Sequence, residues 1–392
     1  MKVVLFTDTY PPFINGVSTS VFNLCKVLKD HGNEVLVVTT RFDDGELELV
    51  DGVLRVPGVE MKNLYGYRLT NVFSSAAFKI ISDFDPDIAH VHTDSTISIF
   101  SRIVARRLNI PVIYTYHTSL EDYTYYVTKG GIFDRPAKKI IRTYSNVIAN
   151  AATGFITPSD KFKEFMRAVG NDIYINVVPT GIEFDLFKDD KVDKNAIASF
   201  KKEHGIDKDT LTFLLLGRIA KEKAMDVSIK CLARYKEKHP DKKLKLIVVG
   251  NGPQKEEYEQ LVKTEGIDDI TDFIGAVPAS EVPFYYHVAD IFTSASITET
   301  QGLTFMEAMA SKNIVIARYD DNLANTIING KTGFFFTDEN NFVDVIDKVL
   351  SMSNEEIEQI KKQALDVIEI YSMERFYKNI EEVYKRAIRK YW

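Results

Sequence analysis

Short runs of apolar, mostly β-branched residues alternate along the chain with longer stretches in which apolar and polar residues repeat at helical spacing. The first half contains six runs that predict strands, at 2–7, 34–40, 88–92, 112–116, 154–157 and 175–178. Six more follow at 212–216, 245–249, 270–274, 291–294, 314–317 and 334–336. Because helical stretches separate most of these runs, each half is expected to form a mainly parallel sheet with helices on both faces.

The alternation is interrupted at Pro179-Thr180-Gly181 and then starts again. The sequence therefore predicts the α/β class, with two doubly wound, Rossmann-like domains at 1–180 and 181–370. After Asp338 only helical periodicity remains, and 371–392 is expected to be a helix that packs back on the N-terminal domain. Two such sheets in tandem are expected to bind a ligand in the crevice at the carboxyl ends of their strands.

Composition and cysteine content narrow the class of protein. The 392 residues are 45% hydrophobic and 27% charged, as in ordinary globular proteins. Cys25 and Cys231 have no CxxC partner, which excludes a disulfide framework and a structural zinc site and favours a reducing, cytoplasmic compartment. No apolar run approaches the roughly 18–20 residues of a membrane span, and the run at 3–6 is too short for a signal-peptide core. We therefore expect a protein that stays inside the cell without crossing a bilayer.

The net charge of −7 is unevenly distributed. Residues 1–100 carry a net −5, residues 101–180 carry +5 and the remainder carries −7. An acidic protein repels nucleic-acid phosphate, so general nucleic-acid binding is disfavoured, whereas the embedded basic zone can face an anionic surface.

Two loops after predicted strands contain glycine. Gly16 follows the first strand. A residue without a side chain at this position would let the backbone approach a phosphate or sugar closely. The alternative is that the loop only requires a conformationally permissive residue there. The dinucleotide-binding pattern GxGxxG is absent there. The segment Gly250-Asn251-Gly252-Pro253 is interpreted first as a loop and second as a ligand contact.

Arg218 and Lys223 follow the strand at 212–216, at the entrance of a predicted helix. Two cations at this end of a helix oppose its dipole, which favours anions. A diphosphate lying between them would explain the arrangement, and the alternative is a solvated charged segment.

Two glutamates stand eight positions apart in Glu299-Thr300-Gln301-Gly302-Leu303-Thr304-Phe305-Met306-Glu307. The first is expected in a loop and the second within a helix. Free amides around Gly302 would face an anion, while the carboxylates would accept hydrogen bonds from sugar or ribose hydroxyls. The alternative is that the glutamates only complement the helix dipole.

Histidines mark the end of two strands in the first half. His117 follows the strand at 112–116, and His90 and His92 alternate on one face of the strand at 88–92. No third ligand stands at metal-site spacing, so packing is favoured over metal binding for this pair. Asp85-Pro86-Asp87 precedes a strand and is interpreted as a turn rather than an acidic metal-nucleotide motif.

Taken in order, four elements resemble the retaining glycosyltransferases of family 4, which have the GT-B fold: Gly16, Tyr116-His117-Thr118, Gly217-Arg218 with Lys223, and Glu299-x7-Glu307. The resemblance covers nearly the whole chain. The segments 116–126 and 317–321 are similar to bacterial diacylglycerol glucosyltransferases, which make monoglucosyl membrane lipid. This likeness implies UDP-glucose as donor, diacylglycerol as acceptor and peripheral association with the inner face of the cell membrane.

Carried over residue by residue, the resemblance implies that Arg218 and Lys223 bind the donor diphosphate, Glu307 the ribose and Glu299 the transferred sugar. His117 and Gly16 complete the sugar pocket. The remaining donor-site candidates are Thr300, Gln301, Gly302 and Leu303. The catalytic candidates are His117, Glu299, Arg218 and Lys223. Ala224 departs from the family, in which glycine often follows the lysine, but a small residue is kept.

The acceptor and membrane candidates lie in the basic zone. They are Asp122, Tyr123, Tyr126, Lys129, Arg135, Lys138, Lys139 and Arg142. Apolar residues interleave with these cations, and Pro136 suits the first turn of a basic amphipathic helix at a headgroup layer. The alternative is a solvated helix packed on its own domain.

Neither glutamate is an obvious nucleophile, so a same-face path is favoured in which the departing phosphate oxygen takes the acceptor proton. Arg218, Lys223 and the amides near Gly302 would stabilise the leaving charge, so no metal cofactor is expected. Other functions remain open. They are a transferase with a soluble sugar or polysaccharide-precursor acceptor, a sugar-nucleotide epimerase, and a binding protein without turnover.

Overall fold

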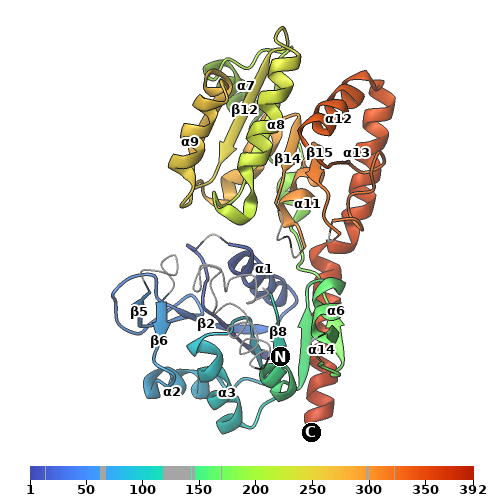
Figure 1. Cartoon of the computed structure of the whole chain (residues 1–392). Helices are drawn as coiled ribbons and strands as arrows, with labels where there is room; N and C mark the ends of the chain where they lie inside the picture. Colours follow the sequence, from blue (N-terminus) through green and yellow to red (C-terminus); the bar gives the residue numbers. More distant parts are fainter. Residues whose placement is uncertain are drawn as a thin grey trace. The chain divides into compact units, whose positions relative to one another are not determined.

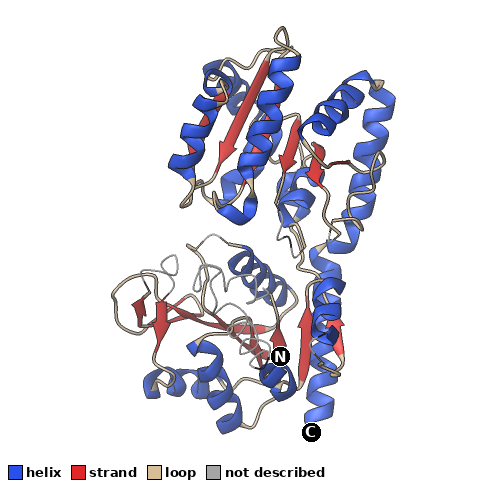
Figure 2. Cartoon of the chain, viewed as in Figure 1, coloured by secondary structure: helices blue, strands red, loops and turns tan. Residues whose placement is uncertain are grey.

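The computed structural model describes residues 1–13, 15–61, 68–117, 143, 146–168, 170–296, 299, 301–321 and 323–392. The chain divides into two compact units, Met1–Gly181 together with Met373–Trp392, and Ile182–Ser372. Each unit has a central sheet with helices packed against it (Figures 1 and 2). Both units are Rossmann-like α/β structures.

The first unit is built on an eight-stranded sheet of order β10-β9-β8-β7-β1-β2-β4-β3. Its strands are β1 (Lys2–Thr7), β2 (Glu34–Thr40), β3 (Glu48–Val50), β4 (Val53–Val56), β7 (Ile88–Val91), β8 (Val112–Thr115), β9 (Gly154–Thr157) and β10 (Ile175–Val177). All pairs are parallel except β3 with β4. A separate antiparallel pair joins β5 (Gly58–Glu60) to β6 (Arg68–Thr70).

Alternate residues of β1 supply the two cores of this unit. Val4 and Phe6 join one buried cluster, and Val3 and Leu5 join the other. Because helices cover both faces, the strand is apolar throughout rather than alternating. The helices whose bounds lie within the described residues of this unit are α1 (Gly16–Asp30), α2 (Ser75–Phe84), α3 (Thr96–Leu108), α6 (Asp160–Ala168) and α14 (Met373–Tyr391).

The C-terminal helix α14 is part of the first unit. Phe376, Ile380 and Tyr384 from one face of α14 are buried in the same cluster as Val3 and Leu5. Helix α14 packs beside α1, whose Val21 and Leu24 belong to the same cluster. The spacing of the apolar α14 residues by four positions is that of one helix face, and this contact brings Tyr384 next to the ends of the central strands.

The second unit has a fully parallel six-stranded sheet of order β13-β12-β11-β14-β15-β16. Its strands are β11 (Leu211–Leu216), β12 (Leu244–Val249), β13 (Thr271–Gly275), β14 (Ile291–Ser294), β15 (Ile314–Arg318) and β16 (Phe334–Phe336). The strand order reverses between β11 and β14, which is the switch point where sheets of this kind bind ligands.

Seven α-helices of the second unit surround this sheet in the described part of the chain. They are α7 (Lys194–Glu203), α8 (Met225–Lys238), α9 (Lys255–Thr264), α10 (Val282–Val288), α11 (Leu303–Ala310), α12 (Glu339–Ser351) and α13 (Asn354–Ile368). Short 3-10 turns include η2 (Lys221–Lys223). Ser353 and Glu356 form a capping box at the start of α13, satisfying two backbone amides that the helix itself leaves without acceptors.

The twelve strands predicted from the sequence are present, each within one residue of its expected ends. Strands β3, β4, β5 and β6 were not predicted. Three of them have only three residues, and β3 is exposed throughout, so they lack the apolar run that identifies a buried strand. The segment Asp85-Pro86-Asp87 precedes strand β7, as interpreted, and connects it to α2: Asp85 is the C-cap of α2, and Asp87 accepts a hydrogen bond from the Lys2 amide at 2.7 Å.

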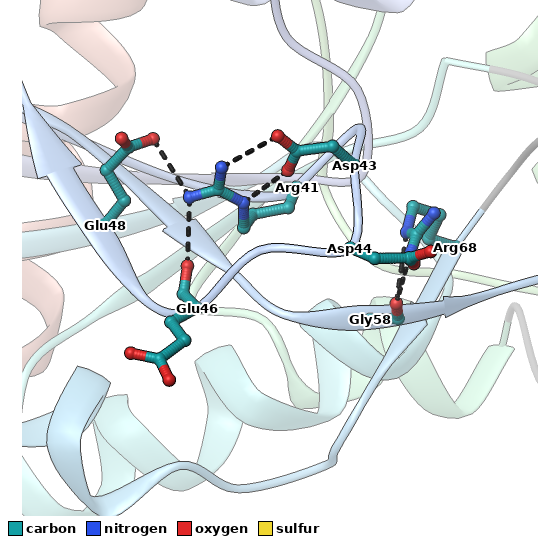
Figure 3. A network of polar contacts seen from close by, with 7 residues as sticks. All are labelled: Arg41, Asp43, Asp44, Glu46, Glu48, Gly58 and Arg68. Carbon is teal, nitrogen blue, oxygen red and sulfur yellow. Dashed lines mark hydrogen bonds and ion pairs between the residues drawn. The ribbon is translucent and has the colours of Figure 1, made fainter.

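Two arginines fix the loop between β2 and β3 (Figure 3). The Arg41 guanidinium bonds Asp43, the Glu46 carbonyl at 3.0 Å and Glu48 at 3.1 Å. Arg68 on β6 bonds Asp44 and the Gly58 carbonyl. Two guanidinium groups with several donors each thus hold an acidic loop that has little apolar surface to bury.

Candidate functional site

The candidate residues of the second unit lie at its switch point. Gly217 and Arg218 directly follow β11, and Glu299 and Gln301 follow the neighbouring strand β14. The carboxyl ends of two adjacent parallel strands therefore present the cation loop and the glutamate loop on the same edge of the sheet.

A buried ion pair joins these two loops. Lys223 Nζ donates to Glu299 Oε1 at 2.7 Å, with the Lys223 side chain 30% exposed and the Glu299 side chain 9% exposed. Burial by itself raises the pKa of Glu299, but the charge of Lys223 and the hydrogen bonds from Lys223 and Ser296 outweigh it, so the pKa lies below its usual value. Glu299 is therefore a carboxylate at neutral pH. Lys223 has three donors and uses one of them in this contact.

The turn that carries Lys223 depends on an unusual backbone conformation. Residues Lys221–Lys223 form the 3-10 turn η2, and Ala224 then adopts φ +45° and ψ +42° before α8 begins at Met225. This left-handed conformation costs a residue with a side chain roughly 1–2 kcal/mol, and glycine is free of that cost. The departure at Ala224 noted from the sequence thus has a physical meaning, since this is a position that favours glycine.

Gly302 forms the N-terminal boundary of α11. It adopts φ +77° and ψ +50°, and no side chain caps the helix there. The first amides of a helix lack partners within it, so those that follow Gly302, beginning with Leu303, are oriented toward any anion at this edge. A Cβ at Gly302 would lie 2.5 Å from a Leu323 methyl group, which adds a steric reason for glycine.

Glu307 lies in α11 and is held by a tyrosine. Tyr286 Oη donates to Glu307 Oε2 at 2.9 Å. Burial raises the pKa of Glu307 to about 7, against the opposing effect of this hydrogen bond. The two glutamates eight positions apart therefore differ in charge state: Glu299 is ionised at neutral pH, whereas Glu307 titrates there.

The glycine loop after β12 contacts the backbone of the residues on either side of Arg218. Gly250 has φ +141°, and a Cβ on it would overlap the Gly217 carbonyl. Gly217 donates to the Val249 carbonyl at 3.0 Å, and Ile219 donates to the Asn251 carbonyl at 3.0 Å. The interpretation of this segment as primarily a loop is thus supported, because its glycines allow two backbones to touch.

In the first unit, three histidines gather at the carboxyl ends of β7 and β8. His92 Nδ1 and His117 Nε2 are hydrogen-bonded at 2.9 Å. His90 bonds Tyr384 Oη and Thr115 Oγ1, each at 2.7 Å. Burial lowers the pKa of His117 to about 4 and that of His90 and His92 well below the usual value. The sequence signal for this cluster was the alternation of His90 and His92, but it did not reveal His117 as their neighbour.

Other candidates are placed differently or lie outside the described residues. Gly16 was expected in a loop but is the first residue of α1, where the Asn15 side chain accepts a hydrogen bond from the Ser18 amide. Asparagine caps helices well because its side chain replaces a missing acceptor, so the helix begins one turn earlier than expected. The candidates outside the described residues are Thr300, Asp122, Tyr123, Tyr126, Lys129, Arg135, Lys138, Lys139 and Arg142.

Two further features concern metals and membranes. Within the described ranges, no group of three or more His, Cys, Asp or Glu side chains has a geometry that could hold a metal ion. None of the helices described is both long and apolar enough to span a bilayer.

Comparison with known proteins gives matches over almost the whole chain. Residues 14–186 match the family model described as Glycosyltransferase Family 4, and residues 197–367 match that described as glycosyl transferases group 1. The chain is 31% identical to the alpha-monoglucosyldiacylglycerol synthase of Acholeplasma laidlawii, covering 100% of this chain and 98% of that protein. It is also 31% identical to the synthase of the same name from Streptococcus pneumoniae, covering 99% and 86%.

Solved structures show a likeness of fold. Anabaena HepE, solved in complex with UDP and glucose, matches with a TM-score of 0.74 at 16% identity, covering 97% of this chain and 98% of HepE. The sucrose-phosphate synthase of Thermosynechococcus elongatus also gives a TM-score of 0.74, at 20% identity and 98% coverage of each chain.

Proposed function

The chain belongs to the family 4 glycosyltransferases, which have the GT-B fold, and we propose that it moves glucose from UDP-glucose to the 3-hydroxyl of 1,2-diacylglycerol with retention at the anomeric carbon. The observation that carries this proposal is the 31% identity, over nearly full length, to two proteins named as alpha-monoglucosyldiacylglycerol synthases. The acceptor is a membrane lipid, so the enzyme would act at a membrane surface.

The second unit offers a donor site of matching chemistry. Arg218, the two remaining donors of Lys223 and the amides after Gly302 would hold the diphosphate. Glu307 would bind the ribose and Glu299 the transferred sugar. In this arrangement Lys223 contacts the leaving diphosphate while keeping the Glu299 carboxylate in place through its ion pair.

The reaction needs no protein nucleophile. The bond between the anomeric carbon and the phosphate oxygen breaks as the lipid hydroxyl approaches on the same face, and the hydroxyl proton passes to the departing phosphate oxygen. Arg218, Lys223 and the helix amides stabilise the negative charge that develops on the diphosphate. His117 and Gly16 would complete the sugar pocket, with His117 neutral because burial lowers its pKa to about 4. No metal cofactor is required in this scheme.

One assay tests the proposal against its alternatives. The protein is incubated with UDP-glucose, with and without vesicles containing diacylglycerol, and with or without EDTA, and products are identified by mass spectrometry. We expect an α-glucosyl diacylglycerol that forms only with the lipid and persists in EDTA. A changed UDP-sugar without acceptor would indicate an epimerase. No product with the lipid would contradict the acceptor, and EDTA sensitivity reversed by Mg²⁺ or Mn²⁺ would contradict the metal-free scheme.

The pH dependence of donor binding tests the role of Glu307. A ribose hydroxyl donates to a carboxylate better than to a carboxylic acid, and the pKa of Glu307 is about 7. The diphosphate diester of UDP-glucose does not titrate near neutral pH, so the donor itself contributes no change. We expect the dissociation constant of UDP-glucose to rise as the pH falls below 7, by about tenfold or more in total, the scale of one hydrogen bond to a charged group, and then to level off. In Glu307→Gln this dependence should vanish, and an unchanged pH profile in the variant would contradict the assignment.

Membrane docking is proposed for the basic zone. The cations Lys129, Arg135, Lys138, Lys139 and Arg142 would each contribute roughly 1 kcal/mol of attraction to an anionic leaflet, with strong salt sensitivity. Replacing Lys138, Lys139 and Arg142 with glutamate should abolish co-sedimentation with anionic vesicles. Equal binding of wild type to neutral and anionic vesicles would argue against this patch, leaving Lys385, Arg386, Arg389 and Lys390 on α14 as the next candidates.

A further inference from the structure

The contact between His92 and His117 has a chemical consequence for the proposed sugar pocket. Nε2 of His117 is engaged with Nδ1 of His92 at 2.9 Å. Within the described part of the chain, His117 Nδ1 makes no hydrogen bond, so it is the nitrogen that can meet a substrate hydroxyl. Whether it meets that hydroxyl as a donor or as an acceptor depends on where the imidazole proton lies.

A neutral imidazole has one nitrogen that donates and one that accepts. Burial lowers the pKa of His117 to about 4 and that of His92 well below its usual value, so both rings are neutral at pH 7. In a hydrogen bond between two neutral rings, one nitrogen must carry a proton and the other must not. The proton positions on His92 and His117 are therefore coupled, so removing the His92 imidazole releases the constraint on the tautomer of His117.

His92 is buried and packed against a second histidine. It is only 4% exposed, and its ring centroid lies 4.0 Å from that of His90. His90 cannot turn freely because Tyr384 from α14 and Thr115 from β8 occupy both of its nitrogens. Tyr384 of α14 thus bonds His90, the ring of His90 packs against His92, and His92 bonds His117.

A structural metal site does not account for this cluster. His90 has both nitrogens engaged with hydroxyl groups, and the facing nitrogens of His92 and His117 are bonded to each other rather than aimed at a common point. A metal ligand needs a free lone pair directed at the ion. The arrangement instead matches a chain of side chains that orients one imidazole.

We propose that His92 is a positioning residue that fixes the ring orientation and tautomer of His117, and through them the hydrogen bond that His117 makes to the transferred sugar. The inference rests on the proposed function of His117 in the sugar pocket. His92 touches no substrate in this scheme and acts only through its bond to His117.

Substitutions at His92 separate this role from simple packing. The amide of asparagine stands two bonds from Cβ, as Nδ1 of histidine does, whereas that of glutamine stands one bond further. We expect His92→Asn to keep kcat within about threefold of wild type, and His92→Gln and His92→Phe to lower it about tenfold or more, the scale of a misplaced reacting group. The KM for UDP-glucose should change little.

Tautomers can be read without activity. With ¹⁵N-labelled histidine, two-bond nitrogen–proton correlations distinguish the tautomers of the seven imidazoles, and His117→Ala assigns the signals of His117. We expect one neutral tautomer for His117 from pH 5.5 to 8 in wild type and in His92→Asn. In His92→Phe, or in His92→Gln if the phenylalanine variant does not fold, the tautomers should exchange or reverse.

Three outcomes would decide the matter. Wild-type kcat and an unchanged His117 tautomer in both His92→Phe and His92→Gln would reduce His92 to a space-filling residue. Exchanging tautomers of His117 in wild type would also overturn the inference. Full activity of His117→Ala would instead contradict the proposed role of His117, while the spectra would still test its coupling to His92, so the two failures are distinguishable.

Discussion

A Glu299→Gln variant is expected to transfer sugar at least about 100-fold more slowly than wild type, the scale of losing one preorganised transition-state contact. Glutamine keeps the size of the side chain but removes the negative charge that Lys223 contacts at 2.7 Å. It also replaces one carboxylate oxygen with an amide NH₂ group, which cannot accept a hydrogen bond from a sugar hydroxyl. Arg218→Ala should lose a similar factor, because a cation that stabilises the leaving diphosphate is absent.

The measurement is kcat with UDP-glucose and diacylglycerol vesicles, together with thermal unfolding. Asp241→Asn is a matched control, since Asp241 is an exposed carboxylate of the same unit that precedes β12, away from the carboxyl ends of the strands. The control should keep wild-type turnover. Turnover in Glu299→Gln equal to that of the control would remove Glu299 from the active site.

The central strands could be predicted because each is a continuous apolar run. Strands such as β1 and β11 are buried on both faces, and this burial requires apolar residues at successive positions. The exposed strand β3 places no such demand on its sequence, and β5 and β6 pair only with each other. These short strands depend on partners and loops, including the contacts of Arg41 and Arg68, which local pattern does not encode.

The candidate site could be predicted in its residue types but not in its contacts. Resemblance to a family indicated Lys223 and Glu299 separately, yet their ion pair joins residues 76 positions apart and follows from the adjacency of β11 and β14. In the same way, the partner of His92 lies 25 positions away, just after the neighbouring strand β8. Periodicity along one segment carries no information on such pairings.

The ion pair also changes what is expected of folding. Substitution of residues that act only in turnover, as proposed for Glu299 and Arg218, should leave the melting temperature nearly unchanged. Because Glu299 is buried beside Lys223, this expectation extends to Glu299→Gln, which removes the buried charge, but not to substitution of the lysine.

Lys223→Ala is expected to lose both activity and stability. The variant leaves the Glu299 carboxylate buried without its cation, and breaking a buried pair costs roughly 3–5 kcal/mol. Since the Lys223 side chain is 30% exposed, water can partly replace it, and we expect a loss of about 2–3 kcal/mol. For a unit of this size that corresponds to a melting temperature lower by roughly 4–12 °C.

The loss of stability in Lys223→Ala should depend on pH, and the pKa of Glu299 gives the direction of that dependence. In wild type, Lys223 keeps the folded-state pKa of Glu299 below its usual value, so the pair stabilises the fold at neutral pH and this contribution is lost as the pH falls through that pKa. In Lys223→Ala only the hydrogen bond from Ser296 still opposes burial, which is the largest effect, so we expect the folded-state pKa to lie above that of the unfolded chain. The penalty should therefore grow as the pH rises above the unfolded value of 4.5 and be smallest in acid.

A double variant separates the two losses. In Lys223→Ala with Glu299→Gln neither charge of this pair remains, so the melting temperature should return most of the way to that of wild type. Turnover should stay at least about 100-fold reduced, because the diphosphate has lost Lys223 and the sugar has lost Glu299. Thermal unfolding of the four proteins at pH 5 and pH 8, with kcat of each at pH 8, completes the cycle. If Lys223→Ala melts like wild type at pH 8, water already solvates Glu299, and the buried pair does not stabilise the second unit.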